Sequence, residues 1–232
     1  MIIRRQFLFF DLGWTLEDET KAQMDRARKT AKELAAIGIQ VTTEDILSKQ
    51  EEGARLMAPS VYRYVLQSYG LDEAAVDDVQ NKVGWNKQLL GLYSSVTETL
   101  MILNKQHYLG LIANQSPGTE GRLQSYGIRH FFKLVFASAE LGLSKPNLRI
   151  FALAERSARC KPVDAWMIGD RLDNDIAPAN RAGWNTIRIL QGYNRFQKPK
   201  AVEEEPDFTV TEIKAVVSIV NSQASMPRPK KK

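Results

Sequence analysis

Cysteine is almost absent from this chain. Cys160 is the only one among 232 residues, so no disulfide can form within the protein. No apolar run approaches the ~20 residues that a membrane-spanning helix requires. The segment Met1–Arg5 lacks the apolar stretch and small-residue cleavage site of a secretory signal. We therefore expect a protein of the reducing cytoplasm that does not associate with membranes.

Excess charge of one sign is also scarce away from the carboxyl terminus. The chain carries 32 Lys and Arg against 27 Asp and Glu, a formal charge of +5, and four of the positive residues lie in 227–232. No aromatic residues alternate with them and no second basic stripe exists, so nucleic-acid binding is not expected. Residues 223–232 are predicted to be a basic disordered tail. The sequence does not indicate an oligomeric state.

What is present is an ordinary globular composition, 44% apolar and 25% charged, in a chain long enough for one large domain with an insert. Residues 17–90 carry helical periodicity without any strand signal, and we predict an all-helical cap domain there. Thr43 and Asp72 are expected to cap two of its helices, the second of which is expected to run to about Leu90.

Short apolar strands alternate with helices through the rest of the chain. The expected strands are 2–10 or 6–10, 108–113, 134–136, 165–168, 186–190 and an edge strand at 208–210, with helices at 96–105, 120–126, 149–158, 175–182 and 213–221. Strands that are apolar throughout are typical of a parallel sheet covered on both faces. We therefore predict an α/β core domain formed by 1–16 and 91–222, with 191–206 as a polar loop.

Two of these apolar strands end in a carboxylate. Asp11 follows the first strand, and Asp170 follows strand 165–168 with Asp175 five residues later. Because the carboxyl ends of parallel strands meet at one edge, we expect one carboxylate cluster. Three acids within 170–175 repel one another unless positive charge lies among them, and hard oxygen ligands suit Mg²⁺. The pattern predicts a Mg²⁺ site.

Two further strand exits or loops carry groups suited to phosphate. Lys145 precedes Pro146 and a helix, which would hold an ammonium near a phosphate and a nucleophilic carboxylate. Asn114 closes strand 108–113 and is followed by Gln115, so an amide donor to a phosphoryl oxygen is expected, backed by N–H groups at the amino end of the next helix.

Taken in order, these elements resemble the haloacid dehalogenase superfamily of hydrolases, in its phosphatase-like branch. That family has an apolar strand ending in Asp, a second ending in Ser/Thr and usually Asn, then Lys-Pro, then Gly-Asp with another Asp five residues on. The resemblance implies a Rossmann-like three-layer core with a helical cap. It also implies Mg²⁺-dependent phosphoryl transfer from a small phosphorylated metabolite through a phospho-aspartate.

The resemblance assigns roles by position, with Asp11 as nucleophile and Lys145 as the neutralising charge. The expected catalytic residues are Asp11, Lys145 and Asn114, the phosphate-binding residues are Asn114, Gln115 and Lys145, and the metal ligands are Asp11, the carbonyl of Gly13, Asp170 and Asp175.

Two positions depart from the family pattern. Gly13 stands where phosphatases of the family carry a second Asp, the general acid and base, and Ala113 stands at the Ser/Thr position. Loss of a general acid–base costs about 10²–10⁴ in rate. Glu17, Asp18 and Ser116 are candidates to compensate. Two alternatives stay open: a non-catalytic or regulatory binding protein, and a 2-haloacid dehalogenase, whose halide leaves without a proton.

Overall fold

The computed structural model describes residues 5–223, and their contacts divide the chain into two compact units. The core unit comprises the residues up to Glu17, Leu92–Gln191 and the residues from Pro199 onward. The helical unit comprises Asp18–Gly91 and Gly192–Lys198. Of the tail expected at 223–232, residues 224–232 lie outside the described part of the chain.

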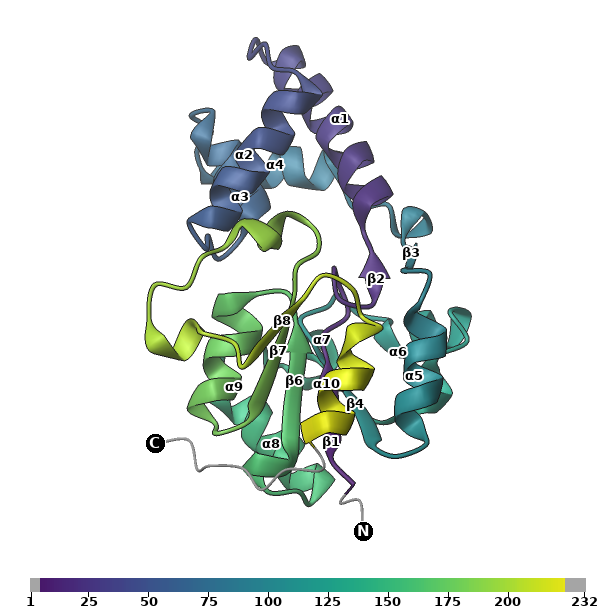
Figure 1. Cartoon of the computed structure of the whole chain (residues 1–232). Coiled ribbons are helices and arrows are strands. Elements are labelled where there is room, and N and C mark those ends of the chain that lie inside the picture. The colour runs from purple at the N-terminus through teal and green to yellow at the C-terminus, as the bar shows by residue number, and fades with distance from the viewer. Residues whose placement is uncertain (1–4, 224–232) are drawn as a thin grey trace. The chain divides into compact units, whose positions relative to one another are not determined.

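The core unit is built on one six-stranded parallel sheet (Figure 1). Its strands are β1 (Phe7–Phe10), β4 (Tyr108–Ala113), β5 (Phe132–Ala137), β6 (Ala165–Gly169), β7 (Asn185–Ile189) and β8 (Phe208–Val210). Their spatial order is β5-β4-β1-β6-β7-β8, the 3-2-1-4-5-6 order of the Rossmann fold. The predicted α/β, Rossmann-like architecture is therefore confirmed. The order of strands reverses at β1, so the crevice of this sheet lies at the end of β1.

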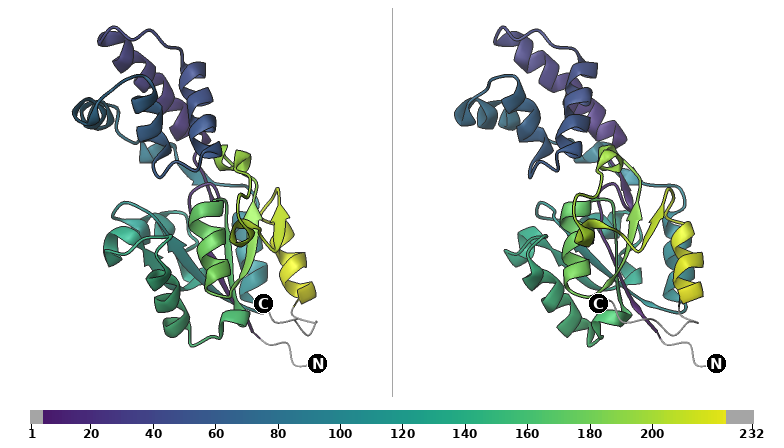
Figure 2. Two further views of the ribbon diagram at one scale, coloured as in Figure 1. Left: turned by 90° about the vertical axis from the view of Figure 1, so that its left-hand side faces the viewer. Right: turned by 60° about the vertical axis from the view of Figure 1, so that its left-hand side comes forward.

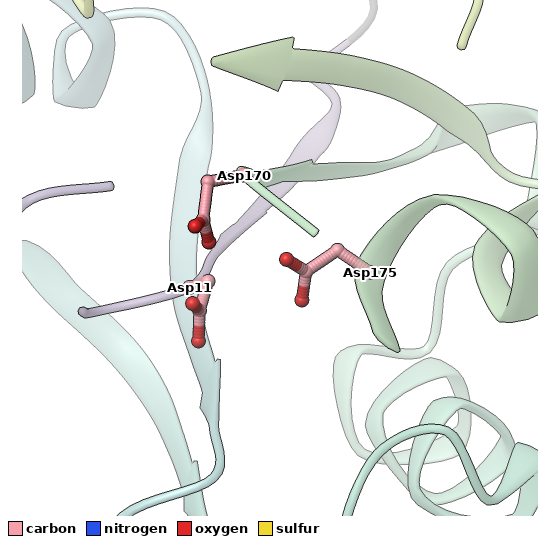
Figure 3. Close-up of side chains that lie close together, drawn as sticks. All are labelled: Asp11, Asp170 and Asp175. Carbon is pink, nitrogen blue, oxygen red and sulfur yellow. The ribbon is translucent and has the colours of Figure 1, made fainter. Parts of the chain in front are cut away.

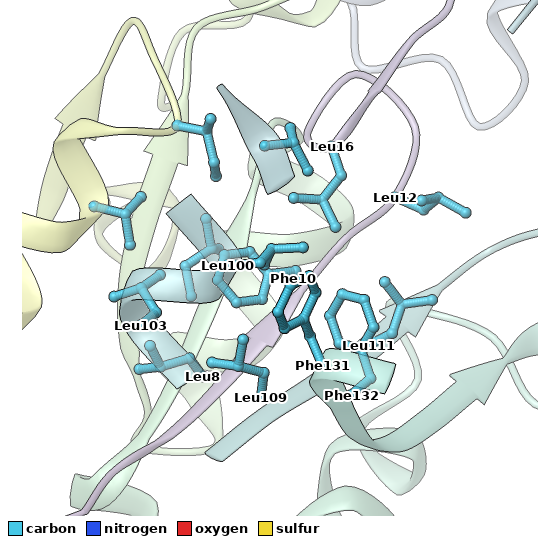
Figure 4. Packing of buried hydrophobic residues seen from close by; sticks show 14 of the residues in the cluster. Leu8, Phe10, Leu12, Leu16, Leu100, Leu103, Leu109, Leu111, Phe131 and Phe132 are labelled. Atoms are coloured by element: carbon cyan, nitrogen blue, oxygen red, sulfur yellow. The ribbon is translucent and has the colours of Figure 1, made fainter. Parts of the chain in front are cut away.

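Helices cover both faces of the sheet (Figure 2). The helices of this unit are α5 (Val96–Asn104), α6 (Thr119–Ser125), α7 (Ser138–Leu141), α8 (Leu148–Ala158), α9 (Ala177–Arg181) and α10 (Ala215–Gln223). Leu8 and Phe10 face the cluster that includes residues of α5, α6 and α10 (Figure 4). Phe7 and Phe9 face the opposite cluster with residues of α8 and α9. Alternation along β1 thus buries it on both sides and holds its carboxyl end in place.

The helical unit has its own apolar core, to which α1–α4 all contribute. Its elements are α1 (Thr20–Ala36), α2 (Thr43–Arg55), α3 (Val61–Ser68), α4 (Glu73–Val83) and the short helix η1 (Lys87–Leu89). Thr42, and not Thr43, caps α2 in a reciprocal capping box with Asp45, whereas Asp72 caps α4 as predicted. α4 ends before the expected position because Gly84 follows it with a φ of 64°.

The chain passes into and out of residues 18–91 through two short paired strands. These are β2 (Glu17–Asp18) and β3 (Gly91–Leu92), so the segment expected to be all-helical is bounded by a small two-stranded sheet. No helix of the described residues combines the length and apolarity needed to cross a membrane.

A later segment, Gly192–Lys198, groups with the helical unit although it follows β7 of the core. The guanidinium of Arg55 on α2 lies 5.0 Å from the ring centre of Phe196, within a cation–π geometry. Gln197 is buried. The sequence predicted only a polar loop over this stretch. The structure instead forms the short helices η5 (Tyr193–Phe196) and η6 (Val202–Glu204) there.

Candidate active site

Three carboxylates converge beyond the carboxyl ends of β1 and β6 (Figure 3). The register pairs Phe10 with Ile168, and the Asp11 N–H donates to the Ile168 carbonyl over 2.8 Å. This pairing brings the residues that follow the two strands to one edge. Asp11, Asp170 and Asp175 each offer one oxygen within 4.8 Å of the others. The cluster expected from the sequence is therefore present.

Asp175 reaches the cluster from a π-helical turn, η4 (Leu172–Ile176), so helix α9 starts later than predicted. The Arg171 N–H donates to Asp175 Oδ2 over 3.0 Å. The side chain packs directly on Gly169, where an added Cβ would lie 2.4 Å from Asp175 Cγ. Glycine is required at this position because the carboxylate occupies the space of a side chain. Asp173 stands apart from the cluster, since Arg171 Nε donates to it over 3.0 Å.

Lys145 joins two of the carboxylates. Its buried ammonium donates to Asp11 Oδ1 over 2.7 Å and to Asp175 Oδ1 over 2.6 Å. Burial alone would lower the pKa of Lys145, but the carboxylates of Asp11 and Asp175 outweigh it and hold that pKa above its usual value. The lysine is therefore a fixed positive charge between the two carboxylates.

The cluster carries more negative than positive charge. Burial raises the pKa of Asp175 to about 6, the charge of Asp11 adds to this rise, and Lys145 opposes it. Burial is the largest cause of this rise, so the ammonium of Lys145 does not fully offset the cost of ionising Asp175. Three nearby carboxylate oxygens form a donor set that suits Mg²⁺, so these residues fit that ion.

Arg188 is a charged neighbour of the cluster that the sequence argument missed. It lies on β7, is buried, and its Nε donates to the Asp170 carbonyl over 3.4 Å. Burial lowers the pKa of Arg188, and the charge of Asp170 partly offsets that effect. The signal was available, because an arginine inside the predicted core strand 186–190 needs a buried partner.

Asn114 is placed by the structure against Lys145. Its Nδ2 donates to the Lys145 carbonyl over 2.7 Å, and its Oδ1 accepts from the Lys145 N–H over 2.9 Å. The carboxamide therefore positions the loop that carries the ammonium. Its expected contact with a phosphoryl oxygen stays a prediction.

Two N–H groups at the amino end of the next helix have an acceptor within the protein. The N–H groups of Gly118 and Thr119, at the amino end of α6, donate to the carboxylate of Glu140 over 3.1 and 3.4 Å. A carboxylate from α7 thus satisfies two of the free donors at this helix end. The expected support of a phosphoryl group by the N–H groups of this helix stays a prediction.

The acids suggested as replacements for the general acid have other partners. The carboxylate of Glu17 accepts from the Tyr126 hydroxyl over 2.7 Å, and Asp18 accepts from the Thr20 N–H over 2.9 Å. Gly13 forms an isolated backbone bridge with Glu17. The role of the Gly13 carbonyl as a metal ligand stays a prediction.

Comparison with known proteins identifies hydrolases similar to this chain. A model of the HAD-hydrolase-like family matches residues 142–216. The glyceraldehyde 3-phosphate phosphatase of Methanopyrus kandleri is 29% identical over 231 residues, covering 94% of this chain and 97% of that protein. The phosphoserine phosphatase of Thermus thermophilus is 31% identical over 109 residues, covering 47% of this chain and 42% of that protein.

A solved structure shows the same fold. The crystal structure of the HAD-hydrolase YfnB from Bacillus subtilis bound to magnesium aligns with a TM-score of 0.67 at 23% identity, covering 94% of this chain and 99% of that one. The family match over residues 142–216, the nearly full-length relative and the shared fold make this chain similar to the haloacid dehalogenase-like hydrolases.

Proposed function

We propose that this hydrolase is a Mg²⁺-dependent phosphatase of small phosphorylated metabolites, with Asp11 as the nucleophile. The observation that carries the proposal is the buried triad in which Lys145 donates to both Asp11 and Asp175 beside Asp170. The names of the relatives point to small phosphomonoesters such as glyceraldehyde 3-phosphate and phosphoserine.

In this mechanism, a carboxylate oxygen of Asp11 attacks phosphorus and the leaving group departs with the electron pair of the bond. Water then hydrolyses the aspartyl phosphate, which restores Asp11 and releases inorganic phosphate. Lys145 fixes the rotamer of Asp11 through a 2.7 Å hydrogen bond. Mg²⁺ held by Asp11, Asp170 and Asp175 would supply positive charge against the phosphoryl oxygens.

We further propose that residues 18–91 act as a cap that selects substrate, since they form a separate compact unit inserted into the core sequence.

The Gly13 position leaves the leaving group without a carboxylic acid, and Glu17 and Asp18 already hold other partners. The lack of a carboxylic acid at position 13 also favours a second candidate, a protein that binds Mg²⁺ and phosphate without turnover.

A phosphate-release assay separates the two. Purified protein with Mg²⁺ is incubated with a panel of three-carbon and amino-acid phosphomonoesters, beside Asp11→Asn and a matched control, Asp78→Asn, on an exposed ion pair with Lys82. We expect release by the native protein and by Asp78→Asn, and none by Asp11→Asn. Phosphate binding by the native protein without release would favour the binding protein. Equal release by Asp11→Asn would refute the nucleophile.

A further inference from the structure

A second buried ionic cluster lies in the core unit, centred on Glu17. This side chain is completely buried, accepts from the Tyr126 hydroxyl over 2.7 Å and lies 3.3 Å from Arg122 Nε. A buried carboxylate is costly unless it is paired and hydrogen-bonded, and here both conditions hold. The pair fixes Arg122, a residue of α6, relative to the loop that follows β1.

Arg122 in turn contacts the side chain of Gln115. Its Nη2 donates to Gln115 Oε1 over 2.6 Å. Arginine has donors only, so the amide atom that faces it must be the oxygen. The orientation of the Gln115 carboxamide is therefore determined by chemistry, and its Nε2 points away from the guanidinium as a donor.

The main chain of Gln115 is held as well. Its N–H donates to Ser138 Oγ over 3.0 Å, and the Ser138 hydroxyl donates to the Gln115 carbonyl over 3.2 Å. Gln115 is thus restrained at both its backbone and its amide oxygen, which is the preorganisation expected of a group that must point in one direction.

The position of Gln115 relates it to the carboxylates. Strand β4 lies beside β1 with Phe10 opposite Leu111, so the residues after Ala113 emerge at the same sheet edge as Asp11. The neighbouring Asn114 contacts Lys145 directly. A hydroxyl donor is missing at Ala113, and the N–H groups of Gly118 and Thr119 at the start of α6 donate to Glu140.

We propose that Glu17 and Arg122 are positioning residues that hold the Gln115 carboxamide with Nε2 toward the phosphoryl group, in place of the hydroxyl absent at Ala113. The proposal rests on the proposed phosphatase function, because it presumes that a phosphoryl group binds beside Asp11. It predicts that Arg122 acts only through Gln115.

A double-mutant cycle on binding of inorganic phosphate tests this. Calorimetric titration with Mg²⁺ present compares native protein, Gln115→Ala, Arg122→Met and the double variant. We expect each single change to weaken phosphate binding about tenfold, the value of one well-placed hydrogen bond. Arg122→Met in the Gln115→Ala background should change affinity less than about twofold, since coupled residues are not additive.

Controls keep the outcome independent of folding. Arg129→Met removes a partly buried arginine that is paired with Glu120 and should leave phosphate affinity unchanged. Arg122→Lys, which keeps a donor for Gln115 Oε1, should recover part of the affinity, and it replaces Arg122→Met in the cycle if that variant does not fold. Additive effects, or an unchanged affinity in Gln115→Ala, would overturn the positioning role alone. Native protein that binds no phosphate would overturn the proposed function and this proposal together.

Discussion

The carboxamide of Asn114 holds the main chain of Lys145 from both sides, donating to its carbonyl over 2.7 Å and accepting from its N–H over 2.9 Å. This double contact links the exit of β4 to the loop that delivers the ammonium. Asn114 therefore holds the backbone of Lys145 in the position from which its side chain reaches Asp11.

Asn114→Ala removes both hydrogen bonds, whereas Asn114→Asp keeps the acceptor but sets a carboxylate against the Lys145 carbonyl. We expect both variants to lower kcat by about tenfold or more while Mg²⁺ affinity changes little. The reason is that a displaced Lys145 ammonium no longer orients the carboxylate of Asp11. Steady-state kinetics and Mg²⁺ titration measure this. Asn86→Ala, which removes a comparable contact to Gln88 in the helical unit, serves as control. Unchanged kcat in Asn114→Ala would contradict the assignment.

Gly169→Ala should damage the metal site. The added methyl would lie 2.4 Å from Asp175 Cγ, so the buried carboxylate must move. We expect Mg²⁺ affinity to fall, as measured by metal-dependent shifts in the thermal unfolding midpoint. Gly121→Ala meets no atom within 4 Å and lies inside helix α6, so it should bind Mg²⁺ normally and gain roughly 0.5–1 kcal/mol of stability. Equal Mg²⁺ affinity in the two variants would rule out this role of Gly169.

The metal-free protein should lose stability as pH rises through the range of Asp175. Its pKa is raised from 3.8 to about 6 by burial, so the folded state binds more protons than the unfolded state between about pH 4 and pH 6. The free energy of unfolding therefore falls across that window. The stabilisation by Mg²⁺ should grow across the same window, because the cation competes with the proton.

Denaturant unfolding at several pH values, compared with Asp175→Asn, isolates this contribution from other carboxylates. The difference in unfolding free energy between native protein and the variant should decline from pH 4 to pH 6 in the presence of a chelator. A difference that rises with pH would show that Asp175 is stabilised as the charged form.

The glycine at position 13 predicts that the reaction rate depends strongly on the leaving group. Without a carboxylic acid at this position, a substrate must expel its leaving group without that proton donor, so aryl phosphates should react faster than alkyl phosphates. Gly13→Asp should raise kcat/KM for alkyl phosphates by about 10²–10⁴, and for aryl phosphates by much less. A phosphate-release assay on a matched series of aryl and alkyl esters provides the measurement. Equal gains for both classes would argue against a missing acid.

Local pattern was sufficient to predict the sheet and its acids. The apolar strand before Asp11 and the Gly-Asp at the end of β6 are signals contained in a few neighbouring residues, and the register of the two strands then brings the carboxylates together. The turn that presents Asp175 was less predictable, because a π-helical turn and an N-capped helix share the same acidic sequence.

Contacts between distant residues could not be predicted from pattern. Glu140 satisfies the amino end of α6 from more than 20 positions away, and Arg122 meets Glu17 across more than 100. Such pairs depend on which loops the folded sheet brings side by side. Sequence reasoning identifies a free donor or an unpaired charge, but many side chains of suitable chemistry compete for it.

The grouping of Gly192–Lys198 with the helical unit limits which segments of the gene can be exchanged without breaking contacts. The chain crosses between the two units after Glu17, Gly91, Gln191 and Lys198. The helical unit is therefore formed by two separate segments of the sequence. A recombination event that replaced residues 18–91 alone would separate Arg55 from the Phe196 ring it was matched to. The helical unit can therefore be exchanged intact only when residues 18–91 and 192–198 are replaced together.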